Sequence, residues 1–317
     1  MSTRIDAYGI SDIGNRRSEN QDQFLVGKLH EGMSVQIGSI AEDRIVRLPS
    51  VEGTFLIVAD GMGGRGRGIV ASAVSVECFA RYLHWRASDF LVPRKELPER
   101  LVAAVRFCHR TICKISQQRP DLRGMGTTLT AAYVLGRKLY VVHAGDSRCY
   151  LLRRSRISQL TTDHTLAQLY RDADGADASN VAEAKLRHVL WNCIGAAESD
   201  LEVEVVECDV RHGDRLVLCS DGLSNYVDKR SITAIVLEST SVETACRSLV
   251  TAANEAGGSD NITVVVGQCV SGRHAESGRQ THSRRDVASS SEDTHASVLH
   301  DNANGRTSCK TPVACSR

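Results

Sequence analysis

Short apolar runs bounded by glycine, asparagine or acidic residues recur along the chain. Runs of this length that are rich in β-branched and aromatic residues predict buried β-strands. The predicted strands are Phe24–Val26, Phe55–Ala59, Thr128–Leu135, Leu139–Ala144, Cys149–Leu152, Val203–Cys208, Leu216–Cys219 and Ile262–Cys269. Two turns, Gly136-Arg137 and Gly145-Asp146-Ser147, predict hairpins between the strands on either side of each.

Longer segments with helical spacing separate these strands into groups. The stretch Ile69–Trp85 is apolar with few helix breakers and predicts a helix packed on a sheet. A capping box of Thr240 and Glu243 predicts another helix, which Gly257-Gly258 would end. A further helix, ending near Pro120, is predicted by one apolar face made of Leu101, Val105, Cys108, Ile112 and Ile115. Grouped strands with hairpins favour an α+β layered architecture over alternating βαβ units.

Composition is typical of a soluble globular protein. Of 317 residues, 42% are hydrophobic and 24% charged, and the net charge of +1 gives no reason to expect nucleic acid or an anionic membrane as a partner. No apolar run approaches the ~20 residues that a membrane helix needs, and the N-terminus lacks a signal-peptide core. The 11 cysteines form no Cys-x-x-Cys pair, which indicates small core residues in a reducing compartment. We therefore expect a cytoplasmic protein.

Two segments differ in composition from the rest of the chain. The segment Thr165–Lys185 is polar and rich in Asp and Ala, and it predicts an exposed helical flap at about residues 165–190. Such a flap either selects substrates or is a simple insertion. Residues 271–317 contain no Phe, Trp or Tyr, so they bury too little apolar area to offset the entropy of ordering. We expect one folded domain at residues 1–270 and a disordered Ser/Thr/Arg-rich tail at 271–317, either a linker or a site of regulatory phosphorylation.

Four aspartates lie at the ends of predicted strands. They are Asp60, Asp146, Asp221 and Asp260. Aspartate is a poor strand residue and is costly to bury unless it is paired or bound to a metal ion. Because these four are far apart in sequence but similarly placed, they suggest one shared cation site. Carboxylate oxygens suit hard cations such as Mg²⁺ or Mn²⁺.

Seven short motifs, in a fixed order, extend this pattern. They are Gly14-Asn15-Arg16-Arg17-Ser18-Glu19-Asn20-Gln21-Asp22, Asp60-Gly61-Met62-Gly63-Gly64, Gly126-Thr127-Thr128, Gly145-Asp146-Ser147-Arg148, Thr162-Asp163-His164-Thr165, Ser220-Asp221-Gly222-Leu223 and Asp260-Asn261. Together they resemble the metal-dependent serine/threonine phosphatase family (protein phosphatase 2C) over about residues 5–268. The resemblance implies a central β-sandwich of two mainly antiparallel sheets flanked by helices, in four layers α-β-β-α.

The activity implied by this resemblance is hydrolysis of phosphoserine and phosphothreonine in proteins. The attacking water would be activated at a dinuclear Mn²⁺ or Mg²⁺ centre, with a third ion as an open question. The expected partners are phosphorylated proteins, including a serine/threonine kinase, and the expected state is a monomer in a bacterial cytoplasm. Two other functions stay open: a catalytically silent module that binds or regulates a phosphoprotein, and a hydrolase of small phosphoesters.

The resemblance also implies roles for individual residues. Asp60 would bridge both metal ions, and the Gly61 carbonyl would complete the shell of one of them. The other ion would be held by Asp221 and Asp260. Arg17 would clamp the substrate phosphate through a bidentate fork, for which Lys is a poor substitute. Arg17 and Asp60 are thus the expected catalytic residues, and the adjacent Arg16 is the rival phosphate clamp.

Two further acids and two departures complete this assignment. Asp22 resembles the family acid that anchors metal-bound water, and Asp146 resembles the acid of a third, weaker metal site. Gln21 stands where the family pattern has an acid, which removes one negative charge and predicts weaker metal affinity. Met62 stands where animal relatives have a histidine, so a metal-bound water would protonate the leaving group. This methionine is typical of bacterial members.

Other polar residues have alternative interpretations. We expect a structural role for His164, with its ring satisfied by a neighbouring loop. His109 and Cys113 share a helix face at i, i+4 and could form half a zinc site, but no partner pair has suitable spacing, so helix packing is favoured. Asp146 could instead belong to a hairpin turn held by Arg148.

Overall fold

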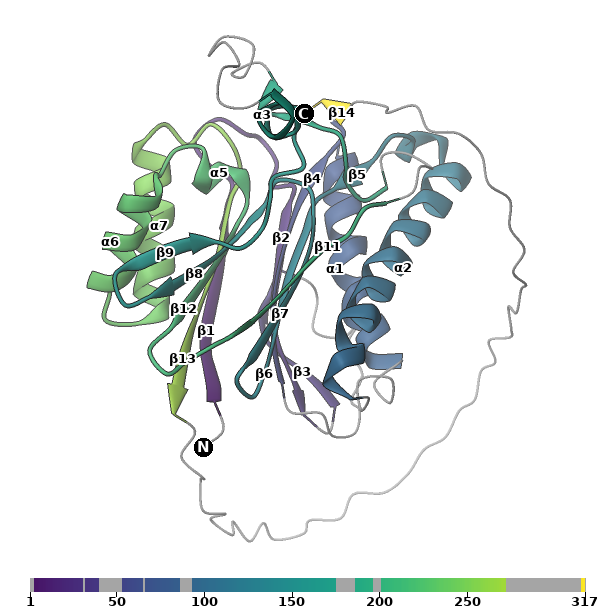
Figure 1. The fold of residues 1–317 in the computed structure, drawn as a ribbon. Helices are drawn as coiled ribbons and strands as arrows, with labels where there is room; N and C mark the ends of the chain where they lie inside the picture. Colours follow the sequence, from purple (N-terminus) through teal and green to yellow (C-terminus); the bar gives the residue numbers. More distant parts are fainter. Residues whose placement is uncertain are drawn as a thin grey trace, which may run out of the picture. The chain divides into compact units, whose positions relative to one another are not determined.

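Two antiparallel β-sheets stack face to face in the computed structural model (Figure 1). The structure describes residues 3–30, 32–39, 53–64, 66–85, 93–174, 186–195, 201–271 and 315–316. Helices α1 and α2 cover the outer face of one sheet, and α6 and α7 cover the outer face of the other (Figure 1). The predicted α+β architecture of four layers is therefore confirmed.

The larger sheet is covered on both faces, which accounts for the apolar run in its central strand β4. Its strand order is β11 (Glu204–Asp209), β7 (Lys138–Ala144), β6 (Leu129–Leu135), β4 (Gly53–Met62), β2 (Asp22–His30) and β3 (Gly32–Gly38), with β5 (Gly126–Thr127) paired to β4. Phe55, Ile57 and Ala59 of β4 pack beneath the helices, whereas Leu56 and Val58 face the second sheet. Since both faces are buried, the strand reads as one continuous hydrophobic run.

The second sheet supplies the other half of the sandwich. Its strand order is β1 (Thr3–Asp12), β13 (Ile262–Ser271), β12 (Arg215–Cys219), β8 (Arg148–Arg153) and β9 (Arg156–Gln159). Leu216, Leu218 and Val265 point into the core between the sheets, while Val217 and Val264 pack against the helical layer. A separate two-stranded ladder joins β10 (Val189–Leu190) to β14 (Cys315–Ser316).

The described helices are α1 (Arg67–Trp85), α2 (Leu97–Gln118), α3 (Leu166–Asp174), α5 (Asp221–Ser224), α6 (Lys229–Glu238) and α7 (Val242–Glu255), with short 3₁₀ turns at Arg94–Glu96 and Pro120–Leu122. Of these, α1, α2 and α7 follow predicted apolar segments, whereas the sequence pattern did not predict α5 or α6. In α2 the residues Leu101, Val105, Cys108 and Ile112 are all buried against the larger sheet. The predicted helices thus lie where the apolar spacing put them.

Two local predictions are wrong. The turn at Gly145-Asp146-Ser147 does not close a hairpin, because β7 and β8 belong to different sheets and the chain crosses between them there. The cap of α7 is Ser241 rather than Thr240, since the Ser241 hydroxyl accepts a hydrogen bond from the Thr244 N–H at 3.1 Å. The hairpin at Gly136-Arg137 is confirmed by the pairing of Leu135 with Lys138.

Parts of two predicted segments lie outside the described residues. In the flap, α3 is helical as expected, but residues 175–185 are outside that set. The predicted disordered tail falls mainly on residues 272–314, which are also outside it, while Cys315–Ser316 pairs with β10. Among the described helices, none combines the length and apolar character that crossing a bilayer requires.

Candidate metal centre

Acidic residues from both sheets meet at one end of the sandwich. Asp22 and Asp60 are opposite each other in the β2–β4 ladder, and Asp221 lies two residues after the end of β12, at the start of α5. The Ser220 hydroxyl donates to the Asp22 carboxylate at 2.6 Å and also accepts from the Thr263 N–H at 3.0 Å. This serine therefore ties the acid of one sheet to the strands of the other.

The backbone of Asp60 is fixed by Thr128. The Asp60 N–H donates to Thr128 Oγ1 and the Thr128 N–H donates to the Asp60 carbonyl, both at 2.9 Å. Thr128 Oγ1 lies 2.7 Å from Ser147 Oγ, and Ser147 is the neighbour of Asp146. The motif Gly126-Thr127-Thr128 thus connects Asp60 to the sheet-crossing turn that carries Asp146.

Asn261 organises the loop that carries Arg17. Its amide oxygen accepts from the Gln21 N–H at 2.9 Å, and its amide nitrogen donates to the carbonyls of Ile13 and Glu19, both at 2.9 Å. Arg17 then reaches Asp260, with Nη2 donating to Oδ2 at 2.7 Å. The loop and the start of β13 are held together as one unit, which brings Arg17 to the acidic cluster.

The electrostatics of this cluster favour a bound cation. Burial raises the pKa of Asp22 to about 7, against hydrogen bonds from Ser220 and Thr263 that lower it, and the charges of Asp221 and Asp260 raise it further. The pKa of Arg17 is raised by its hydrogen bond to Asp260 and by the charges of Asp260, Asp60 and Asp221, while partial burial lowers it. An all-oxygen set of carboxylates with excess negative charge fits Mg²⁺ or Mn²⁺.

A pocket of about 230 Å³ opens beside these acids. Asp146 and Asp221 both line it, so the sheet-crossing turn and the β12–α5 junction face one space. Arg171 of α3 and Arg187 of the flap line the same pocket. The arrangement places guanidinium groups next to the candidate cation site, where a phosphate group would carry its charge.

Comparisons with known proteins agree with this geometry. The sequence profile of the family described as Protein phosphatase 2C matches residues 33–255, more than half of the chain. The chain belongs to the protein phosphatase 2C family. Asp60, Asp146 and Asp221 lie within the matched range, whereas Arg17, Asp22 and Asp260 lie outside it.

Bacterial phosphatases are among the family members most similar to this chain. Serine/threonine protein phosphatase PstP of Mycobacterium tuberculosis H37Rv is 37% identical over 216 residues, which cover 68% of this chain but only 40% of that protein. The phosphatase stp of Listeria monocytogenes EGD-e is 32% identical over 212 residues, covering 67% of this chain and 83% of that protein. The chain thus spans about two fifths of the Mycobacterium relative's length.

Solved structures share the fold at similar identity. The crystal structure of the Mycobacterium tuberculosis phosphatase PstP/Ppp superposes with a TM-score of 0.67 at 32% identity, covering 84% of this chain and 99% of that chain. A structure of the PstP catalytic domain in complex with 2 manganese ions superposes with a TM-score of 0.65 at 32% identity, covering 86% of this chain and 100% of that chain. Manganese binding is therefore shown for the catalytic domain of one structural relative of this protein phosphatase 2C family member.

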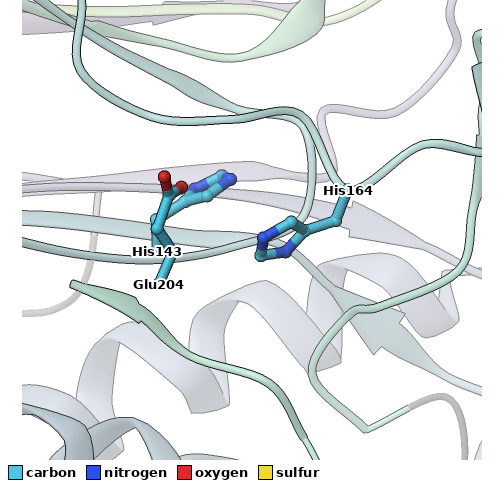
Figure 2. A group of neighbouring side chains, drawn as sticks. All are labelled: His143, His164 and Glu204. Carbon is cyan, nitrogen blue, oxygen red and sulfur yellow. The ribbon is translucent and has the colours of Figure 1, made fainter. Parts of the chain in front are cut away.

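A second group of potential ligands, His143, His164 and Glu204, lies close by, with one ligand atom of each within 4.8 Å of the others. Figure 2 shows the two rings and the carboxylate gathered around one spot. The spacing of these ligand atoms would fit a cation, but the hydrogen bonds of the two rings oppose that assignment. His143 Nε2 faces the carbonyls of Gly145 and Thr162 at 2.9 and 3.1 Å, so it carries a proton.

His164 is fixed in the same way. Its Nδ1 faces two donors, the Gly145 N–H at 3.2 Å and the Asn192 amide at 2.7 Å, so in the neutral ring the proton is on Nε2. Burial lowers the pKa of His164 to about 4 and that of His143 to about 3, so both rings are neutral at pH 7. The structural role predicted for His164 is confirmed, and the pair braces the turn that carries Asp146.

The structure decides several alternatives that the sequence left open. Arg148 forms a bidentate pair with Asp163, with Nε to Oδ1 at 2.8 Å, rather than a contact within its own turn. His109 and Cys113 pack together at 3.5 Å on α2, and the Gly195 N–H donates to the His109 ring. Sequence reasoning missed the positioning roles of Ser220, Thr128 and Asn261, although each stands beside or within a motif that it had identified.

Asp22 makes the stability of the metal-free protein depend on pH. With a pKa of about 7 in the folded state and 3.8 as the ordinary value, the folded state binds more protons between these limits. The free energy of unfolding therefore falls as pH rises from about 4 to 7, by up to about 4 kcal/mol for this one group. In the presence of a chelator, the free energy of unfolding of Asp22→Asn should fall much less from pH 5 to pH 8 than that of the unmodified protein. Urea unfolding at each pH measures both values. Equal pH slopes in the two proteins would contradict this assignment.

Proposed function

We propose that this chain hydrolyses phosphoserine and phosphothreonine in proteins at a dinuclear Mn²⁺ or Mg²⁺ centre. The observation that carries the proposal is the convergence of buried acids from separate segments at one end of the sandwich. Bound divalent cations would supply an activated water and neutralise charge on the phosphoryl group. The residues that would hold them are Asp22, Asp60, Gly61, Asp146, Asp221 and Asp260.

The chain's own groups would place the substrate. Arg17 is half exposed, which leaves part of its guanidinium accessible to a phosphate while Nη2 contacts Asp260. Because Asn261 holds the loop at Gln21 and Glu19, the guanidinium is positioned before substrate arrives. A bidentate fork to phosphate adds geometric specificity that a lysine ammonium would lack.

Arg17 is expected to act mainly in binding. Arg17→Ala should raise the KM for a phosphothreonine peptide by about 10- to 100-fold, the value of a lost hydrogen bond between charged groups, with a smaller change in kcat. Arg16→Ala is the matched control, since Arg16 is the exposed neighbour. Because Arg17 contacts Asp260, the substitution could also change metal affinity. Assays at saturating Mn²⁺ remove that effect from KM, and a separate Mn²⁺ titration of activity measures it. An effect of Arg16→Ala that exceeds that of Arg17→Ala would move the clamp to Arg16.

The activity itself is tested by phosphate release from a phosphothreonine peptide with Mn²⁺, with Mg²⁺ and with a chelator. Release that requires metal is the expected result. Absence of release from folded protein under every metal would favour the silent phosphoprotein-binding alternative. Gln21 would then be the first residue to test as the cause of inactivity, because it lies next to the proposed metal centre. Its backbone carbonyl accepts from the Gly61 N–H, and its side-chain oxygen lies beside Gly68. Competition between phosphopeptides and small phosphates separates a protein phosphatase from a hydrolase of small phosphoesters.

Three further predictions accompany the proposal. A partner serine/threonine kinase and a monomeric state follow from the family resemblance, and a cytoplasmic location follows from the composition. Dephosphorylation of a candidate kinase, size measurement in solution and fractionation of cells test them in that order.

A further inference from the structure

A groove with one cationic wall lies away from the acidic centre, on the outer side of α2. Its volume is about 1220 Å³, and it runs between α2 and the segment Leu201–Val203. The α2 wall presents Arg106, Arg110 and Lys114, which are all exposed and spaced four residues apart. Because residues at i, i+4 and i+8 share a helix face, the three positive charges form one row along the groove.

The charges of this row are not neutralised within the described part of the chain. Some exposed arginines elsewhere in that part contact a carboxylate, as Arg119 contacts Asp121 and Arg247 contacts Glu243. Arg106, Arg110 and Lys114 have no ion pair with any described residue. An anionic group that enters the groove would therefore meet three unneutralised cations at once.

The lining of the groove favours a polypeptide over a nucleic acid. Among the described residues no Phe, Tyr or Trp side chain lines it, and His109 is the one aromatic ring there, so a run of bases would find few stacking partners. The opposite wall carries Leu201, Val203 and the exposed carboxylate of Glu202, which would repel a continuous phosphate backbone. Gln117 and Gln118 at one end offer amide groups to a peptide backbone.

The spacing of the row matches alternate residues of an extended peptide. Four residues of helix rise about 6 Å, and two residues of an extended strand advance about 6.6 Å. Acidic side chains at i, i+2 and i+4 would thus face Arg106, Arg110 and Lys114 in register. The intervening side chains would point to the other wall, where Leu201 and Val203 favour apolar residues.

The groove is also connected to the acidic centre. Gly195 donates to His109 on the groove floor, and its neighbour Ile194 exchanges two backbone hydrogen bonds with Thr127 at 2.8 and 2.9 Å. The Thr127 hydroxyl in turn donates to the Asp60 carbonyl at 2.9 Å. The groove therefore lies on the same rigid framework as the candidate metal centre.

We propose that this groove is a docking site for an extended segment of alternating acidic and apolar residues in the phosphoprotein substrate. This proposal depends on the proposed function in one respect: the function identifies the docked segment as part of a substrate. It holds the substrate outside the catalytic pocket and adds affinity through a second contact. Short phosphopeptides without the acidic segment use the catalytic pocket alone.

The binding test uses a fluorescent Glu-Val repeat peptide without phosphate, so it does not depend on catalysis. Fluorescence anisotropy should show that the peptide binds about tenfold more weakly to Arg106→Ala/Arg110→Ala/Lys114→Ala, because that variant loses three exposed charge pairs with the peptide. Binding to the unmodified protein should also weaken with added salt. Alanine favours helix, so α2 should fold in this variant. The matched control is Arg156→Ala/Lys229→Ala/Arg230→Ala, three exposed cations on β9 and α6, which should bind like the unmodified protein. A Gln-Val repeat peptide should bind much more weakly.

The kinetic test joins the same repeats to a phosphothreonine peptide through a Gly-Ser linker. The Glu-Val extension should lower KM about tenfold relative to the Gln-Val extension, and the groove variant should remove this difference. Turnover of p-nitrophenyl phosphate should be unchanged by the groove variant. Equal peptide affinity in the groove variant and the unmodified protein would overturn the docking site, as would tighter binding of a single-stranded RNA of equal charge. Loss of all turnover with intact peptide binding would instead overturn the proposed function.

Discussion

Asp60→Asn is expected to lower kcat for a phosphothreonine peptide by about 1000-fold, equivalent to about 4 kcal/mol of transition-state stabilisation. Asp60 is buried, and in the proposed function it would contact both cations. An asparagine retains the shape of the side chain and the two backbone hydrogen bonds to Thr128, so the fold should be preserved. The substitution removes one negative charge and one anionic ligand, which should also weaken Mn²⁺ binding measured by calorimetry.

The matched control for this prediction is Asp209→Asn. Asp209 is an exposed acid on β11 that pairs with Lys138 at 3.3 Å, far from the acidic centre in the sheet order. Its substitution should change neither kcat nor Mn²⁺ affinity, since an exposed ion pair contributes little. If Asp60→Asn kept near-full turnover with the same metal dependence, the assignment of the metal centre would be wrong.

The central strands could be predicted because burial on both faces gives each of them a continuous run of apolar residues. Strand β4 is buried on both faces, so its apolar run is continuous up to Asp60, which lies within the strand near its end. Strand β1 was not predicted, because it divides its side chains between two cores, with Ile5 between the sheets and Tyr8 and Ile10 towards the helices. A mixed run with Gly9 and several polar residues shows neither a clear alternation nor a block of apolar residues.

The sheet-crossing turn shows a different limit of sequence reasoning. Gly145-Asp146-Ser147 has the composition of a hairpin turn, and local chemistry alone does not distinguish a return to the same sheet from a crossing to the other. The choice depends on distant residues. Thr128 lies within 2.7 Å of Ser147, and the Gly145 carbonyl accepts from the His164 N–H at 2.7 Å.

The aspartates of the site could be found in the sequence, whereas their supports could not. Short motifs mark where a carboxylate follows a strand, but the hydrogen bond from Ser220 to Asp22 joins residues 198 positions apart. Arg17 and Arg16 are indistinguishable by spacing, and only the contact of Arg17 with Asp260 separates them. Long-range pairing of this kind depends on how the two sheets are stacked.

Gly222→Ala is expected to have the second-largest effect, through the backbone rather than a ligand. A Cβ on Gly222 would lie 2.0 Å from the Asn261 carbonyl oxygen, which is backbone and unable to rotate away. The β12–α5 junction and the start of β13 would have to separate, and these segments carry Asp221 and Asp260. We expect a loss of about 3 kcal/mol in the free energy of unfolding, at the upper end of ordinary overpacking.

The same displacement should weaken Mn²⁺ binding at least as clearly as it lowers stability. Gly213→Ala is the matched control, because a Cβ there meets no atom within 4 Å and the cost comes only from its positive φ of 85°. That variant should lose about 1 kcal/mol of stability and keep its Mn²⁺ affinity. If Gly222→Ala lowered stability without changing Mn²⁺ affinity, the close approach of Gly222 to Asn261 would serve the fold alone. The two carboxylates would then be positioned by other contacts, such as the bond between Arg17 and Asp260.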